Sequence, residues 1–243
     1  MNNSRPQLFG MIAGLFLAAG LVLSAMLATS AWLKIKNSQF ITVKGSAQSN
    51  VESDLAIWSG NFTAEAETLL DAQHEIQANR QMVEKFLAGV GVTNAVFAPI
   101  NIEELMAARK SADEFVSKRT VGYRLSQIVS VESTNVELLD KLDATPLLEQ
   151  GLIFTVAPTQ FIYSKSGEAK IEMLAEAAKD ARVRAEQIAS QGERAVAQLN
   201  DASQGIFQIT PLHSVSTSWE GVSDTTSRQK TITAVVTATF LLK

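Results

Sequence analysis

An uncharged, strongly apolar run near the N-terminus constrains the fold more than any other feature of the chain. It extends from Leu8 to Leu33, 26 residues that read LFGMIAGLFLAAGLVLSAMLATSAWL. A helix that rises about 1.5 Å per residue would span about 39 Å over this length, more than the roughly 30 Å hydrocarbon core of a bilayer. We therefore predict a transmembrane helix over 8–33, after a short tail over 1–7 and before a folded domain over 34–243.

Two alternatives to a permanent anchor remain open from the sequence. A secretory signal peptide has an apolar region of only about 7–15 residues, so this run favours an uncleaved anchor, although 28–30 (ATS) resembles a cleavage site. The other alternative is a buried helix of a soluble protein. Arg5 lies before the run and Lys34 and Lys36 follow it, so the positive-inside rule does not decide the orientation. Trp32 fits an aromatic residue at the membrane interface.

The composition excludes several classes of function. A formal net charge of −4 gives no general attraction to a phosphate backbone, so we expect no nucleic-acid partner. The chain has no cysteine, which excludes disulfides, thiolate metal sites and a cysteine nucleophile.

After the apolar run, strand patterns alternate with two long helical patterns. Such an order predicts an α+β fold, a mainly antiparallel sheet with two long helices packed on it, in one domain. Pro158 indicates an edge position or a bulge. We expect strands over 40–45, 55–63, 95–105, 120–133, 151–163, 205–214 and 229–243; long helices over 64–89 and from Gly167 or Glu168 onward; short helices near 136–142 and 145–146; and a charged segment over 107–119 and a polar loop over 214–228.

The second long helix contains AEAAKDARVRAEQIA (175–189), which has almost no large apolar side chains. Its acids and bases are interleaved, which is typical of a solvated face rather than of a nucleic-acid patch. A stripe centred on alanine predicts that another element packs very close to this helix. The residues assigned to the buried stripe are Ile171, Leu174, Ala178, Ala181, Ala185 and Ile188.

The apolar run itself carries small residues at intervals of four. In lipid, faces of this kind allow helices to approach closely, so we predict that the anchor contributes to self-association. The two faces are Gly10, Gly14 and Ala18, and Gly20, Ser24 and Ala28.

Four segments together resemble the SIMPL-domain family, a domain of unknown function that includes a bacterial periplasmic immunogenic protein. The resemblance covers about residues 40–243 and implies an α+β fold, a place in the Gram-negative cell envelope, and a large ring-like or channel-like homo-oligomer. This chain has Ser53 where the family often has proline before the Asp at position 54. The segments begin with ITVKGSAQSNVESDLAIWSGNF at Ile41 and continue with VGYRLSQIVSVES (121–133), AKIEMLAEAAKDARVRAEQIAS (169–190) and TITAVVTATFLL (231–242).

No motif for catalysis, cofactor binding or metal binding is present, and we assign no catalytic, cofactor or metal residue. His74 and Glu75 begin like a zincin motif, but Ala78 stands where the second histidine belongs. We expect His74 on a helix surface, His213 near a strand end, Asp54 in a turn hydrogen bond, and Glu103 and Glu104 on opposite faces of a strand. Trp58, Phe207 and Trp219 are expected as core or interface anchors.

We therefore expect a non-enzymatic cell-envelope protein that self-assembles into a ring-like or channel-like homo-oligomer. It would be a single-pass membrane protein, held in the bilayer through 8–33. The resemblance further implies the bacterial inner membrane, with the folded domain in the periplasm, and a link to envelope or oxidative stress. The alternatives are a binding module for another envelope protein or a lipid, and an enzyme whose site the sequence does not reveal.

Overall fold

The computed structural model describes residues 5–37, 39–110, 116–214 and 220–243. The chain falls into two compact units, each built from discontinuous segments, a division that composition had not indicated. Unit 1 comprises the described residues of Met1–Ala47, Leu174–Gly205 and Val235–Lys243, and unit 2 those of Gln48–Met173 and Ile206–Ala234.

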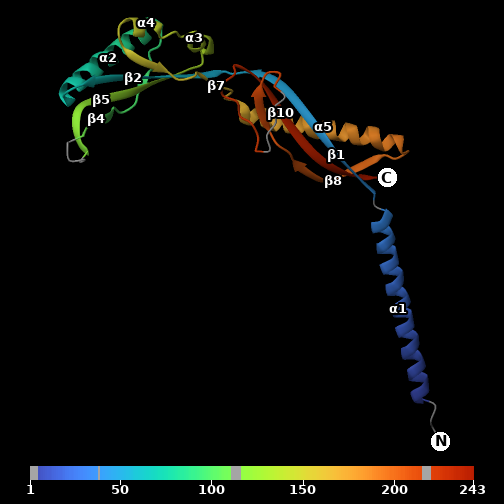
Figure 1. Ribbon diagram of the computed structural model, residues 1–243. Helices are drawn as coiled ribbons and strands as arrows, with labels where there is room; N and C mark the ends of the chain where they lie inside the picture. Colours follow the sequence, from blue (N-terminus) through green and yellow to red (C-terminus); the bar gives the residue numbers. More distant parts are fainter. Residues whose placement is uncertain (1–4, 38, 111–115, 215–219) are drawn as a thin grey trace. The chain divides into compact units, whose positions relative to one another are not determined.

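The first helix, α1, extends from Arg5 to Asn37 and confirms the predicted apolar helix (Figure 1). Its segment Gly10–Leu33 has a mean hydropathy of 2.3 and is not buried by other described residues. By length and composition this segment is able to cross a membrane, a property that it shares with N-terminal signal sequences.

Unit 1 contains a sheet with the strand order β1-β10-β8, and a helix covers one of its faces. Helix α5 (Ser166–Gln191) packs on one face, and its alanines meet an apolar cluster that includes Val43 and Phe240. The strands are β1 (Gln39–Glu52), β8 (Val196–Gln204) and β10 (Gln229–Leu242).

The buried stripe of α5 differs from the predicted one. Ala181 and Ala185 are fully buried as predicted, whereas Ile171, Ala178 and Ile188 are exposed. The buried residues instead recur at every fourth position: Met173, Ala177, Ala181, Ala185 and Ala189. The prediction was wrong because it alternated spacings of three and four and so included Ile171 and Ile188, whereas the buried positions recur at a spacing of four and β1 approaches closely at Ala177 and Ala181.

Unit 2 contains a second sheet, sheet B, in which all pairings are antiparallel. Its order is β3-β5-β2-β6, with β4 also on β5 and β7 also on β2. A short further strand, β9 (Gln208–Pro211), pairs with Lys230–Thr233 of β10. The strands of sheet B are β2 (Leu55–Ala66), β3 (Val96–Phe97), β4 (Asn101–Lys110), β5 (Val116–Ser133), β6 (Ile153–Val156) and β7 (Gln160–Ile162).

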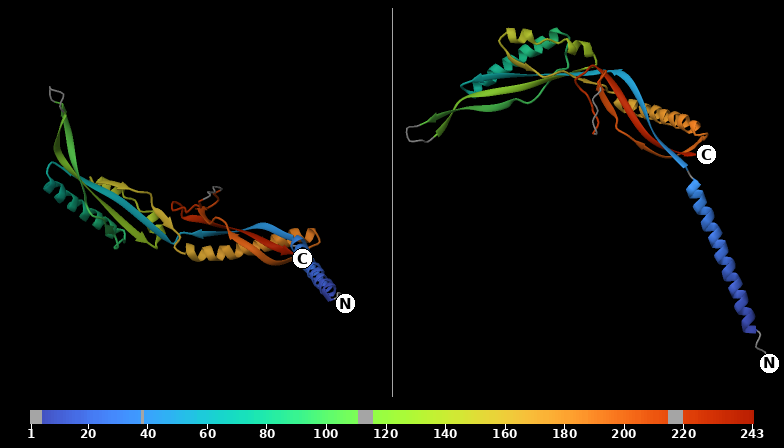
Figure 2. Two further views of the ribbon diagram at one scale, coloured as in Figure 1. Left: turned by 90° about the horizontal axis from the view of Figure 1, so that it is seen from below. Right: turned by 45° about the vertical axis from the view of Figure 1, so that its right-hand side comes forward.

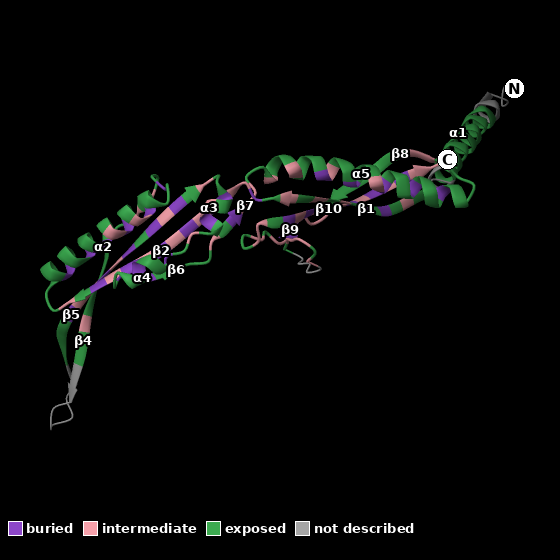
Figure 3. Ribbon diagram, turned by 90° about the horizontal axis from the view of Figure 1, so that it is seen from above, coloured by how far each residue is buried: buried purple, intermediate pink, exposed green. Residues whose placement is uncertain are grey.

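One face of sheet B is covered by helices α2 (Leu69–Gly89), α3 (Val136–Asp140) and α4 (Thr145–Glu149) (Figure 3). At the centre of this core the ring of Phe154 stacks with Trp58 and with Phe62, at centroid distances of 5.8 and 6.5 Å. Gly60 lies between these two residues on β2, and a Cβ there would overlap the Phe154 ring. The absence of a side chain at position 60 therefore makes room for the aromatic stack.

Several predicted boundaries were wrong. Helix α2 begins at Leu69 instead of 64, because β2 continues its pairing to Ala66 and the Thr68 side chain caps the helix by accepting a hydrogen bond from the Asp71 N–H. Strand β1 continues past Gly45, where the sequence had predicted its end. Strand β8 was not predicted, because its residues are mostly polar and exposed.

Two other strand predictions needed correction. Much of the charged segment 107–119 belongs to β4 and β5, so these strands are longer than expected. The single strand predicted over 151–163 is instead β6 and β7, which are separated near Pro158 and pair with β2 at the edge of the sheet. The interruption agrees with the bulge or edge position predicted from that proline.

Candidate functional site

The face of sheet B opposite α2 is open to solvent and carries large apolar side chains. Val96, Ile128 and Ile153 are 68%, 51% and 61% exposed. Pairing registers place all three on this face, opposite Ser130, Asn61 and Thr63 of neighbouring strands. We call these three residues, with Ser130 and Glu132, the free face. Exposed apolar side chains grouped on one surface are typical of an interaction site.

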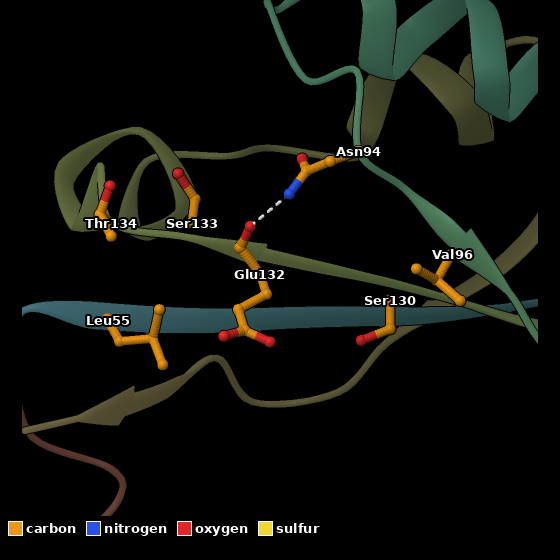
Figure 4. Close-up of a pocket in the computed structure, with 7 residues that line it drawn as sticks. All are labelled: Leu55, Asn94, Val96, Ser130, Glu132, Ser133 and Thr134. Atoms are coloured by element: carbon orange, nitrogen blue, oxygen red, sulfur yellow. Dashed lines mark hydrogen bonds between the residues drawn. The ribbon is translucent and has the colours of Figure 1, made fainter. Parts of the chain in front are cut away.

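A hollow of about 520 Å³ lies at one end of the free face (Figure 4). Its volume falls within the range of about 300–1,000 Å³ that is usual for small-ligand sites. Side chains from β2, β3 and β5 form its walls, together with the turns that flank these strands. The lining residues are Leu55, Asn94, Val96, Ser130, Glu132, Ser133 and Thr134.

The lining of this hollow offers apolar surface and several polar groups to a ligand. Asn94 is committed to the fold, because its Nδ2 donates a 2.7 Å hydrogen bond to the backbone oxygen of Glu132. Figure 4 shows the Glu132 carboxylate and the Ser130 hydroxyl on the same side of β5 as Leu55. Among the described residues, the lining has one carboxylate together with the hydroxyls of Ser130, Ser133 and Thr134. These groups can accept hydrogen bonds from a polar ligand, and the hydroxyls can also donate them.

A row of charges crosses the same face further along β5. Arg124 Nε lies 2.6 Å from Glu65 Oε1, and its Nη1 lies 3.3 Å from Glu103 Oε2. The hydrogen bond that Arg124 donates to Glu65 and the negative charge of this carboxylate raise the pKa of Arg124. The three side chains are more than 40% exposed, so solvent screens these pairs and they contribute little to stability. The row leaves the face with an excess of acid.

Strands β4 and β5 continue beyond the rest of sheet B as a two-stranded ribbon (Figure 2). The pairing of β5 with β2 ends at Tyr123, and in the described residues of 116–122 β5 pairs with β4. We call the described residues of 105–110 and 116–122 the arm. Met106 and Val121 of the arm are 56% and 51% exposed. Two-stranded ribbons are marginally stable in water, so the arm has little stabilisation of its own.

Beside the start of β10, unit 2 contains a buried ion pair. Lys230 is 1% exposed, and its Nζ donates to the backbone oxygen of Asp224 at 2.6 Å and to Oδ2 at 3.0 Å. The Asp224 carboxylate also accepts hydrogen bonds from Thr226 and from the Ser227 N–H. Burial acts to raise the pKa of Asp224, but these hydrogen bonds and Lys230 outweigh it and hold the pKa far below its usual range. The Asp224 carboxylate and the Lys230 ammonium group thus both have hydrogen-bond partners, and the pair holds the 224–228 segment against β10.

Asp54 fastens the turn between β7 and α5. Its Oδ1 accepts from the Ser164 N–H and its Oδ2 from the Ser164 hydroxyl, both at 2.7 Å. Burial acts to raise the pKa of Asp54, but the two bonds from Ser164 outweigh it, and the pKa is lowered. The neighbouring Ser53 N–H donates to the Arg228 oxygen at 2.9 Å, a bond that proline could not make. These contacts give Asp54 the turn role predicted from the sequence.

A second hollow, of about 330 Å³, lies beside the start of α5. Lys170 Nζ lies 5.7 Å from the ring centroid of Phe207, within the range of a cation–π contact. Phe207 is half-buried and lines this hollow together with Gly221. It is therefore a surface anchor rather than a residue of the deep core.

The other residues considered from the sequence lie apart from one another. His74 is exposed on α2, and His213 is exposed in a turn at a φ of 64°. Glu103 pairs with Arg124, whereas Glu104 accepts a hydrogen bond from Thr120, so the two glutamates do not meet. Trp219 lies outside the described residues. Within the described part of the chain, no group of three or more His, Cys, Asp or Glu side chains is placed to hold a metal ion.

The sequence contained two signals that were overlooked. Alternation along 120–133 puts Ile128, Ser130 and Glu132 on one face of the strand, a mixture of apolar and polar residues that suits a binding surface. Similarly, Lys230 alternates with Ile232 and Ala234, which belong to the buried face of β10. A lysine in phase with buried residues indicates a buried ion pair.

Comparison with known proteins identifies the family. Residues 41–240 match SIMPL, described as a protein of unknown function (DUF541). No curated protein matches the chain. The match covers both units from the third residue of β1 to Phe240 near the end of β10, which is well over half of the chain. The chain therefore belongs to the SIMPL family.

Proposed function

We propose that this chain is a non-enzymatic, membrane-anchored cell-envelope protein whose folded part self-assembles into a ring-like homo-oligomer. The arm carries the proposal. It exposes Met106 and Val121 on a ribbon that pairs with no third strand among the described residues. A partner that covers these side chains would stabilise the ribbon as well as the complex.

The free face of a second copy is a suitable seat for the arm. It offers Ile128 and Ile153 as apolar contacts. The charges are also complementary, since Lys118 and Arg119 are exposed on the arm and Glu132 is exposed on the free face. Arm and free face are different surfaces, so the contact is heterologous, and a heterologous contact generates a ring when its rotation closes.

The apolar helix supports the location. Gly10–Leu33 is long enough to hold the protein in a bilayer. We assign the folded part to the periplasmic side of the inner membrane, on the basis of the resemblance to periplasmic SIMPL proteins. A link to envelope or oxidative stress follows from the same resemblance.

The test measures the mass of the full chain in mild detergent by multi-angle light scattering. One variant alters the arm (Met106→Asp with Val121→Asp) and another alters the free face (Ile128→Asp with Ile153→Asp). Each variant alone should give smaller species than the unaltered chain. A mixture of the two should recover a one-to-one complex, because one variant retains an intact face and the other an intact arm.

The matched control is Ile171→Asp with Ile188→Asp, which changes two exposed apolar residues of α5. It should leave the mass of the assembly unchanged. A monomeric unaltered chain would contradict self-assembly. An unaffected mass in both test variants would show that the arm and the free face are not the contact.

The hollow favours a second candidate function, a binding module for another envelope protein or a lipid. Leu55 and Val96 offer apolar contact and Glu132 a carboxylate in a space of about 520 Å³. Native mass spectrometry of membrane-extracted protein tests it. A bound species that is retained by the unaltered chain and lost from Val96→Asp would favour this function over assembly alone.

A further inference from the structure

One end of unit 1 lies next to the end of the apolar helix along the chain. Helix α1 ends at Asn37 and β1 begins at Gln39, so one residue separates them. Consecutive Cα atoms are about 3.8 Å apart, which keeps the start of β1 within about 8 Å of the helix end. If α1 spans a bilayer, the start of β1 must therefore lie at the level of the lipid headgroups.

Pairing of β1 with β10 brings two other segments to the same end. Hydrogen bonds between the Thr42 and Thr239 hydroxyls and between the Thr231 hydroxyl and the Asn50 side chain indicate one antiparallel register, which places Phe40 opposite Leu241. Two backbone hydrogen bonds then join Lys243 to Ala195, at 2.9 and 3.0 Å. We call 39–40, 241–243 and 191–195 the anchor-side end of unit 1 (Figure 1).

The anchor-side end has the chemistry of a surface that meets anionic lipid. Arg194 and Lys243 are exposed there, against one acid, Glu193. Lys34 and Lys36 precede it at the end of α1 and add two further positive charges to a chain whose overall charge is −4. Basic residues are thus concentrated where the chain leaves the apolar helix, although the protein as a whole is acidic.

Exposed aromatic side chains lie before and after the end of α1 in the sequence. Trp32 is 69% exposed near the end of the apolar segment, and Phe40 is 51% exposed at the start of β1. Aromatic residues are enriched at membrane interfaces, where an apolar ring meets the headgroups. The two rings therefore mark a belt through which unit 1 would contact the surface.

We propose that the anchor-side end of unit 1 docks on anionic lipid headgroups, so that the folded part rests on the membrane instead of moving freely on its tether. This rests on the proposed function, because it requires α1 to remain in the bilayer. Each Lys or Arg near an anionic surface contributes about a fivefold preference for the docked state. Glu193 offsets one of the two basic charges, so Arg194, Lys243 and Glu193 together should favour docking about fivefold.

The absence of cysteine allows a clean label for the test. The full chain carries a fluorophore on Gln191→Cys, the last residue of α5, or on Lys179→Cys as a control. The two positions are about 18 Å apart along the helix. Vesicles of phosphatidylcholine alone, or with one third phosphatidylglycerol, contain a headgroup-labelled nitroxide lipid that quenches nearby fluorophores.

We expect stronger quenching at 191 than at 179, dependence on phosphatidylglycerol, and loss at high salt. Arg194→Glu with Lys243→Glu should reduce the quenching at 191 to the level at 179. Lys141→Glu with Lys165→Glu changes the net charge equally at residues outside the anchor-side end and should have no effect. The salt dependence is measured on labelled protein without the charge reversals. It therefore tests the proposal even if the reversals disturb folding.

The outcomes separate the two proposals. If the chain floats with the vesicles but is quenched equally at 191 and 179, or without regard to phosphatidylglycerol and salt, lipid docking is overturned while the anchor stands. If the chain does not float with the vesicles, the anchor is overturned and the docking proposal falls with it.

Discussion

The backbone of Gly45 in β1 lies directly against the backbone of Ala181 in α5. A Cβ at position 45 would overlap the Ala181 N and Cα atoms and the Ala177 oxygen. A second contact fixes the same crossing, since the Ser46 N–H donates a 2.8 Å hydrogen bond to Asp180 Oδ2. The helix and strand therefore approach until only glycine and alanine fit between them, which explains a helix built on alanine.

Enlarging Ala181 should destabilise the protein. Ala181→Leu places a larger side chain in a fully packed contact, and overpacking of this kind costs about 1–3 kcal/mol. Chemical denaturation of the purified protein measures the change. Ala178→Leu, on the exposed side of the same helix, is the matched control and should leave the free energy of unfolding nearly unchanged. Equal stability of both variants would contradict the close packing.

Replacing Lys230 should lower the free energy of unfolding more than replacing any charged residue at the surface. Lys230→Met leaves the Asp224 carboxylate buried without its cation, and breaking a buried pair in this way costs about 3–5 kcal/mol. Changing Asp224→Asn in the same chain should recover part of the loss, because the unpaired charge is then absent. Arg182→Met, which breaks an exposed pair with Glu186, should cost less than about 1 kcal/mol. A small effect at Lys230 would mean that the pair does not fasten its segment.

Asp54 should make stability depend on acidity. Its pKa is lowered in the folded protein, so its contribution is fully present above the unfolded value of about 3.9 and is lost as the pH falls through the folded value. The thermal midpoint of the unaltered protein should therefore decrease below about pH 4. Asp54→Asn should be less stable at neutral pH and should show a weaker decrease. A decrease as steep as that of the unaltered protein would contradict the role, and Asp201→Asn, at an exposed site, is the control.

Much of the fold could be predicted because its signals are local. The apolar run predicted α1, alternation predicted β2 and β10, and helical periodicity predicted α2 and α5. Strand β8 has no such signal, since VAQLNDASQ is largely polar and becomes a strand by pairing with β10. Gly45 was predicted as a strand end because a glycine in the sequence can mark either the end of a strand or a position where another backbone packs closely. Only the position of α5 distinguishes the two cases.

The candidate site was harder to predict than the fold. The free face depends on which side of β5 the helices cover, and the pattern of 120–133 alone does not say which side that is. The arm depends on where β2 stops pairing with β5, which is a long-range property of two strands. The hydrogen-bonding role of Asp54 could be predicted, because an aspartate after a polar turn usually accepts hydrogen bonds from nearby backbone.

The apolar segment should remain on the mature protein. Its length exceeds the apolar region of a signal peptide, so cleavage near 28–30 is not expected. The intact mass of membrane-extracted protein measures this directly. A mass that begins near Ala31 would contradict retention, and with it both the anchor and the docking of unit 1.

The anchor should add to self-association without defining it. No other described atom lies within 4 Å of a Cβ built at Gly10, Gly14 or Gly20, so these faces are open to a neighbouring helix. In lipid, close van der Waals contact at small residues is a main source of affinity between helices. Gly14→Ile with Ser24→Ile closes both faces and should shift the detergent-solubilised protein towards smaller species in light scattering. Leu15→Ile with Leu23→Ile keeps the size of two exposed anchor residues and should leave the mass unchanged. If the first pair of changes also leaves the mass unchanged, the anchors stand apart in the lipid and act only as tethers.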